Sequence, residues 1–159
     1  MPLSPLGILH TVVAIAAIFS VVVLLWQDKQ ILISRGLGKF YLVATVIAAA
    51  TALGIYRHGG PNAAHGLAVL TILAVIVGAL ATRVSFLGGV QKYFVALCFS
   101  ATILFHALPT ATEILTRFPM DAPMVSSLTD PLLQKTFGVI VLVFAVGLAL
   151  QMNWLRKNA

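Results

Sequence analysis

Apolar residues form five blocks along the chain, and each block is about as long as a helix that crosses a bilayer. About 20 apolar residues span the hydrocarbon core as a helix, and a helix bonds its backbone polar groups internally, as that core requires. The pattern therefore predicts an all-α fold, an integral membrane bundle of five transmembrane helices. We place these helices at residues 6–26, 37–56, 63–82, 92–109 and 132–154.

Glycine and proline mark the connections between the blocks. The segment Gly59-Gly60-Pro61-Asn62 predicts a tight turn whose last residue is the N-cap of the third helix. Gly88-Gly89 interrupts the chain before the fourth block, and Pro109 is expected to end or kink the fourth helix. The one long connection covers residues 110–131, and we expect it to begin as a short helix lying on the bundle.

Composition agrees with a membrane protein that has a single domain. The chain has 159 residues, a mean hydropathy of +1.05 and only 9% charged residues, against roughly 25% in soluble domains. Five spans use up this length, so we expect residues 1–159 to form one transmembrane domain. The first block has neither a basic residue before it nor a signal-type cleavage site, and we expect it to be retained as a span.

The charged residues predict an orientation rather than a nucleic-acid site. The net charge is +6, but the ten Lys and Arg residues are scattered at the ends of the blocks, so no nucleic-acid partner is expected. The positive-inside rule places the C-terminus in the cytoplasm, and the N-terminus and residues 110–131 outside, in a multi-pass protein of the bacterial inner (cytoplasmic) membrane. The basic residues of the predicted inner side are Lys29, Arg35, Lys39, Arg83, Lys92, Arg156 and Lys157.

The histidines are the candidate functional residues. All four fall on the predicted outer side: His10, His58, His65 and His106. An imidazole is costly in lipid unless it has a partner. His10, His65 and His106 are expected on helices at similar heights, and neighbouring helices pack about 8–10 Å apart, so their rings can meet at one ion or one haem iron. The pattern therefore predicts a metal or haem site formed by these three residues.

Two further residues are candidates for the same site. Glu113 extends a stripe with His106 and Thr110, and a carboxylate there can be a metal ligand, an acceptor for a ring N–H or a proton carrier. His58 follows Arg57 at the end of a span, where a polar residue is more often an interfacial anchor than a ligand.

Simpler interpretations exist for some of these residues. His65 has the position of a polar first-turn residue, and Thr110 and Glu113 have the spacing of a capping box. His10 is expected close to water. His106 is the hardest to explain without a ligand, because it lies within the apolar run Phe99–Leu108.

Four segments carry a resemblance to a known group of proteins: His10-Thr-Val-Val-Ala, Ser34-Arg-Gly-Leu-Gly-Lys-Phe-Tyr, Asn62-Ala-Ala-His-Gly-Leu-Ala and Phe105-His-Ala-Leu-Pro. Together they resemble small bacterial polytopic membrane proteins of unknown function, which are very distantly similar to the membrane b-type cytochromes. That resemblance implies a helical bundle with haem between histidine pairs. In many such proteins a histidine precedes the inner-side Arg-x-Leu-Gly motif, where this chain has Ser34. Only the outer-side histidines are therefore carried over.

Three functions follow as hypotheses for a protein embedded in the lipid bilayer. In the first, His10, His65 and His106 hold b-type haem or a transition metal (iron, copper or zinc), and the protein transfers electrons with quinol as its partner. In the second, the protein is a structural or assembly subunit without a cofactor, and small-residue faces dock it to other membrane subunits or to copies of itself. In the third, it is a zinc-dependent membrane hydrolase with Glu113 as the base.

Overall fold

Five α-helices and one 3₁₀-helix make up the part of the chain that the structure, a computed structural model, describes: residues 4–56 and 60–158. No strand occurs in these residues, so the all-α prediction is confirmed. The bounds of the helices are α1 Pro5–Asp28, α2 Gly36–Ala52, α3 Ala63–Ala81, η1 Ser85–Val90, α4 Gln91–Arg117 and α5 Pro131–Lys157.

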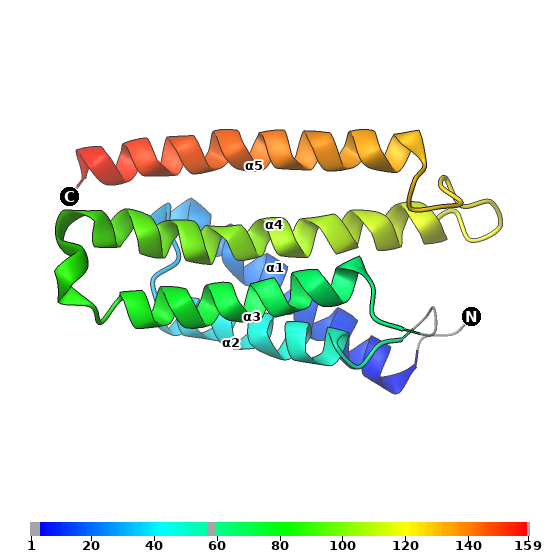
Figure 1. Cartoon of the computed structure of the whole chain (residues 1–159), viewed down its shortest axis with the longest axis horizontal. Coiled ribbons are helices and arrows are strands. Elements are labelled where there is room, and N and C mark those ends of the chain that lie inside the picture. The colour runs from blue at the N-terminus through cyan, green and yellow to red at the C-terminus, as the bar shows by residue number, and fades with distance from the viewer. Residues whose placement is uncertain (1–3, 57–59, 159) are drawn as a thin grey trace.

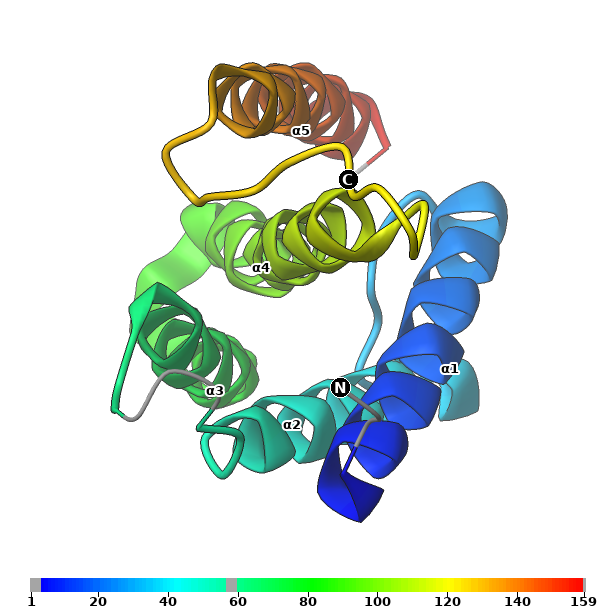
Figure 2. The same cartoon turned by 90° about the vertical axis from the view of Figure 1, so that its right-hand side faces the viewer.

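The helices run roughly along one axis (Figure 1), and α1 to α4 form a ring when viewed from one end (Figure 2). In this ring α1 contacts α2, α2 contacts α3 and α3 contacts α4, and α4 also contacts α1. α5 lies outside the ring and packs on α4. Each helix therefore packs against the helix that precedes it in the chain.

Four helical segments of the described chain are long and apolar enough to cross a membrane: α1, α3, the stretch Ser85–Arg117 and α5. α2 is also apolar but has only 17 residues. Large apolar side chains cover the outside of the bundle, among them Phe19, which is 71% exposed, and Leu142, which is 64% exposed. Water does not favour such a surface, whereas lipid covers it without cost. The chain is that of a multi-pass membrane protein.

Side-chain caps fix where three of the helices begin. Ser4 accepts a hydrogen bond from the backbone N–H of Gly7 at the start of α1, and Asp130 accepts one from Leu132 at the start of α5. The next residue in each case is a proline, which suits the first helical position. The predicted N-cap of α3, Asn62, is confirmed, since its side chain accepts from the N–H of the second residue of the helix.

The predicted end of α2 is wrong by one turn. The apolar block continues to residue 56, but α2 ends at Ala52, and the backbone N–H of Gly54 then bonds to the carbonyl of Thr51. A Cβ at Gly54 would lie 2.9 Å from Cδ2 of Leu6, so this turn lies directly against the start of α1. In place of the last helical turn that the apolar pattern predicts, the chain therefore forms a turn that packs against α1.

The predicted end of α4 at Pro109 is also wrong. α4 continues through the proline to Arg117, so the short helix expected after Pro109 is the last part of α4 itself. Threonine hydroxyls reinforce this part, because Thr110 donates to the carbonyl of His106 and Thr112 to that of Leu108. Proline is tolerated in membrane helices where side chains and neighbouring helices satisfy the local backbone.

Small residues let α3 and α4 approach closely. Gly78 of α3 lies against the ring of Phe99 of α4, and a Cβ built on Gly78 would lie 2.6 Å from Cε1 of that ring. Phe99 is fully buried and belongs to the apolar core with Leu24, Tyr41 and Val75. This packing matters because lipid provides no hydrophobic force between helices, so close fit must hold them together.

We expect Gly78→Ala to destabilise the bundle, because the buried Phe99 ring must move to admit the added methyl group; overpacking of this kind costs about 1–3 kcal/mol. Gly66→Ala is the matched control on the same helix, since nothing lies within 4 Å of its added Cβ. The measurement is the thermal midpoint in mild detergent, read by fluorescence-detected size exclusion. Equal midpoints for the two variants would contradict the packing of α3 on α4.

Candidate functional site

His10 of α1 is anchored on α2 by one ring nitrogen. Its Nδ1 lies 2.9 Å from the carbonyl oxygen of Ala48 and 3.3 Å from the hydroxyl of Thr51. A carbonyl can only accept, so Nδ1 carries the proton, and in the neutral ring Nε2 carries the lone pair. Metal-bound histidines usually have this arrangement, with one N–H on a carbonyl and the other nitrogen as ligand.

His106 of α4 contacts the same helix one turn away. Its Nε2 lies 3.2 Å from the hydroxyl of the fully buried Thr45, and the centroid of its ring lies 6.5 Å from that of Tyr41. Thr45 and Ala48 are three residues apart and so share a face of α2. His106 and His10 are close enough to interact electrostatically. The structure therefore places both imidazoles against α2, about one turn apart along that helix.

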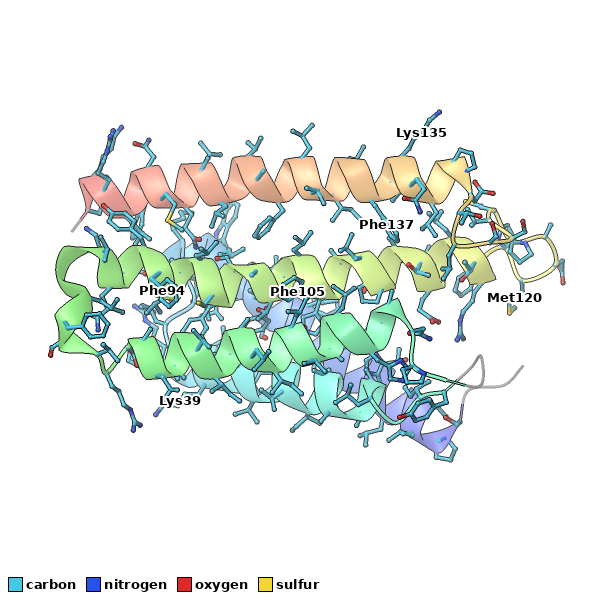
Figure 3. All side chains as sticks on the ribbon, in the orientation of Figure 1. Lys39, Phe94, Phe105, Met120, Lys135 and Phe137 are labelled. Carbon is cyan, nitrogen blue, oxygen red and sulfur yellow. The ribbon has the colours of Figure 1, made fainter. Side chains whose placement is uncertain are left out.

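His106 lies deeper in the bundle than predicted. It was expected about one turn inside the outer end of its helix, but α4 extends to Arg117, which puts His106 near the middle of the span. Figure 3 shows its sequence neighbour Phe105 at this position, far from Met120 beyond the end of the helix. An imidazole at this depth needs a protein partner more than one near the interface does.

A buried pair of hydroxyls continues the polar contacts between α2 and α4. The hydroxyl of Thr102 donates to the carbonyl of Phe99, so its single proton is used, and the hydroxyl of Tyr41 must donate to Thr102 across 2.6 Å. Tyr41, Thr45 and Thr102 are all fully buried. Together with His106 they form what we call the α2–α4 polar cluster.

Tyr41 and Thr45 are members of this cluster that the histidine pattern did not reveal. A signal for them was present, however. Tyr41 and Thr45 are spaced by four on α2, and Thr102 and His106 are spaced by four on α4, so each pair lies on one face of its helix. Two polar pairs with the same spacing in separate apolar blocks indicate helices that pack face to face.

His65 has a different role, because it completes a capping box at the start of α3. Its Nδ1 accepts from the backbone N–H of Asn62, while the side chain of Asn62 caps the helix in return. A protonated Nδ1 would instead donate to Oδ1 of Asn62, which lies 3.1 Å away. Nε2 of His65 is buried without a hydrogen-bond partner. The centroid of the His65 ring lies 4.8 Å from that of the Tyr56 ring. The role of a polar first-turn residue, which is the simpler interpretation of His65, thus explains the contacts of its Nδ1.

The remaining candidates lie apart from the two central histidines or outside the described residues. Glu113 lies about two turns beyond His106, and its carboxylate forms an ion pair with Arg117 one turn further along α4. His58 lies outside the described residues. Within residues 4–56 and 60–158, no three histidine, cysteine or acidic side chains are grouped so that they could hold a metal ion.

No family model, curated protein or solved structure matches this chain. Its function must therefore be inferred from its own residues. The chemically distinctive feature is the pair His10 and His106, each held by α2, with the α2–α4 polar cluster beside it.

The Tyr41–Thr102 bond is expected to couple the two residues energetically. Thr102→Val leaves the Tyr41 hydroxyl buried without an acceptor, whereas Tyr41→Phe removes the donor; the double variant should cost less than the sum of the two. Hydrogen bonds between membrane helices contribute about 0.6 kcal/mol on average and up to about 1.7. Unfolding titrations of the four proteins in mixed micelles measure the coupling. Strict additivity would show that the hydroxyls do not interact in the folded protein.

Proposed function

We propose that His10 and His106 bind a redox cofactor inside the bundle and that the protein transfers electrons between a lipid-soluble quinol and an acceptor. The observation that supports this is the pairing of two imidazoles from separate helices along one face of α2. Buried imidazoles in lipid are costly. His10 and His106 are both half-buried between helices, and each is held on α2 by its own hydrogen bond, which a ligand explains better than anchoring does.

The donor set suits b-type haem, or a single iron or copper ion. Histidine is a common ligand of haem iron, and His10 and His106 would supply two such ligands. Nδ1 of His10 is engaged by Ala48 and Nε2 of His106 by Thr45, so one nitrogen of each ring remains. The cofactor would supply reversible one-electron chemistry; the protein holds the rings and excludes water from them.

A structural or assembly subunit is the second candidate, and α5 favours it. Only 6% of the apolar 18-residue segment of α5 is buried inside the structure, compared with 22–28% of the corresponding segments of the other three candidate spans. A helix that packs on one neighbour and exposes the rest of its surface can dock a further subunit. In this case His10 and His106 would serve only to hold α1 and α4 on α2.

The absorption spectrum of protein purified from cells supplied with iron, copper and haem tests the proposal. We expect a Soret band or stoichiometric redox metal in the wild type. His10→Ala and His106→Ala should each lose most of it, because a site with few ligands loses much of its affinity with each one. His65→Ala is the matched control and should retain the cofactor, since its ring caps α3.

Three outcomes would count against this assignment. If His65→Ala loses the cofactor as fully as His106→Ala, the three-histidine site predicted from the sequence is favoured instead. Stoichiometric zinc in a colourless protein would favour the hydrolase. If the wild type carries neither metal nor haem and has normal helix content by circular dichroism, the result would favour the structural or assembly subunit.

The orientation is part of the proposal and has its own test. The seven basic residues of one predicted side favour a cytoplasmic C-terminus. A C-terminal alkaline phosphatase fusion should therefore be inactive in bacterial cells, and a C-terminal green fluorescent protein fusion should fluoresce. The reverse result would place the basic ends of the helices outside and contradict an inner membrane with the usual charge bias.

A further inference from the structure

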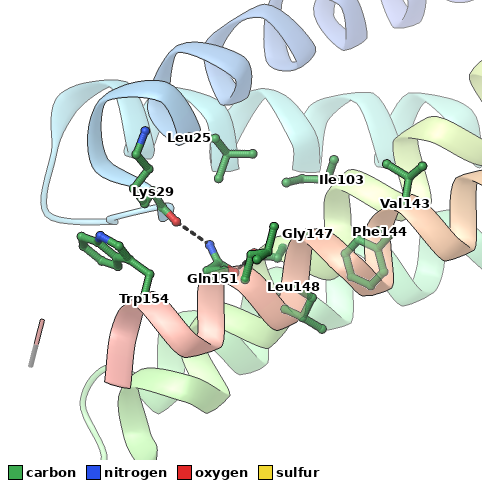
Figure 4. A pocket seen from close by; sticks show the side chains of 11 residues that line it. Leu25, Lys29, Ile103, Val143, Phe144, Gly147, Leu148, Gln151 and Trp154 are labelled. Carbon is green, nitrogen blue, oxygen red and sulfur yellow. Dashed lines mark hydrogen bonds between the residues drawn. The ribbon is translucent and has the colours of Figure 1, made fainter. Parts of the chain in front are cut away.

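A groove runs between α1 and α5 over the surface of α4, at the end of the bundle where α1 and α5 both terminate (Figures 1 and 4). Its volume is about 480 Å³. Apolar side chains line most of it, among them Leu25, Ile103, Val143, Phe144 and Leu148. On α5 the lining extends from Val143 to Trp154, which is about 16 Å along a helix. A groove of this length and chemistry fits a hydrocarbon chain lying along the helix.

The polar groups on the floor of the groove already bond to one another. Ser100 donates to Oε1 of Gln151, and Nε2 of Gln151 donates to the carbonyl of Lys29, both across 2.8 Å (Figure 4). Lys29 adopts a left-handed backbone conformation, with φ of 58°, as it ends α1. A quinone headgroup needs free donors and acceptors, and these groups are engaged. The floor therefore does not favour a quinone.

One charged residue, Lys29, lines the end of the groove. Its ammonium group has three donors, of which one bonds to the carbonyl of Trp26, and the group lies 5.5 Å from the centroid of the Trp26 ring. The carboxylate of Asp28 does not neutralise Lys29, because it forms an ion pair with Arg35 across 3.0 Å. Three more basic residues lie near the ends of α4 and α5 at the same end of the bundle: Lys92, Arg156 and Lys157.

Charge and shape together identify one class of ligand. Basic pockets between membrane helices bind the headgroups of anionic lipids, and each Lys or Arg near the surface contributes about 1 kcal/mol. Trp154 lines the groove at the same end, where tryptophan favours the interface between lipid and water. We propose that the groove binds an anionic phospholipid, with one acyl chain between α1 and α5 and its phosphate at Lys29.

Tryptophan fluorescence tests this lipid site directly, because the chain has only two tryptophans. Trp26 is 81% exposed, and Trp26→Phe keeps an aromatic ring beside the ammonium of Lys29, so this variant should fold normally and leave Trp154 as the sole reporter in the groove. This variant is reconstituted into vesicles that contain brominated phosphatidylglycerol or brominated phosphatidylcholine. We expect the anionic lipid to quench Trp154 at about fivefold lower mole fraction. When Lys29→Gln is added to Trp26→Phe, the two brominated lipids should quench Trp154 at equal mole fractions.

A matched pair of glycines on α5 separates the groove from a general charge effect. Gly147 lines the groove and Gly138 does not, and nothing lies within 4 Å of a Cβ added at either position. Gly147→Leu should fill the groove and abolish the preference for the anionic lipid, whereas Gly138→Leu should keep it. Circular dichroism checks that both variants retain their helix content.

Native mass spectrometry of the protein released from bacterial membranes gives a second readout. We expect a retained anionic phospholipid in the wild type, and its loss in Gly147→Leu but not in Gly138→Leu. Equal quenching of Trp154 by the two brominated lipids would overturn the proposal, as would an unchanged preference in Gly147→Leu. A retained quinone in place of phospholipid would overturn it as well and assign the groove to electron transfer.

Discussion

Polar groups inside a bilayer have no water to bond to, and this constraint determines how the helices of this protein are joined. The apolar faces cannot choose a partner, because lipid is as good a neighbour as another helix. The polar side chains can. His10 joins α1 to α2, the Tyr41–Thr102 bond joins α2 to α4, and Gln151 joins α5 to both α4 and α1. Each of these contacts satisfies a buried group and fixes which helices are neighbours.

The same constraint distinguishes the histidines from one another. Nδ1 of His65 finds its partner locally, in Asn62 of the same turn, whereas Nε2 is buried without a hydrogen bond. Nδ1 of His10 and Nε2 of His106 find their partners on α2, a different helix. The three histidines that the sequence predicts at similar heights therefore have two different roles: His65 caps a helix, and His10 and His106 contact α2. In each ring of the pair, α2 engages one nitrogen: Nδ1 of His10 and Nε2 of His106.

Much of the fold was predictable because helix length and apolar pattern are strong signals in lipid. The start of α3 at Asn62 followed from local chemistry, since a cap and its helix are neighbours in sequence. The end of α4 did not, because Pro109 stops a helix in water and is accommodated in a membrane bundle. Tyr41 and Gln151 were missed for another reason: their partners are far away in the chain, and only the packing of the helices shows which side chains meet.

The order of helix contacts has a consequence for how the protein is made. α1 packs on α2, α2 on α3, α3 on α4, and α4 on α5, so each helix after the first finds a partner already in the membrane when it enters. The ring of α1 to α4 is complete before α5 is synthesised, and closing it needs only the contact of α4 with α1. The last helix then docks through Gln151 onto Ser100 and the carbonyl of Lys29. The structure can therefore assemble during translation, without any helix waiting exposed for a distant partner.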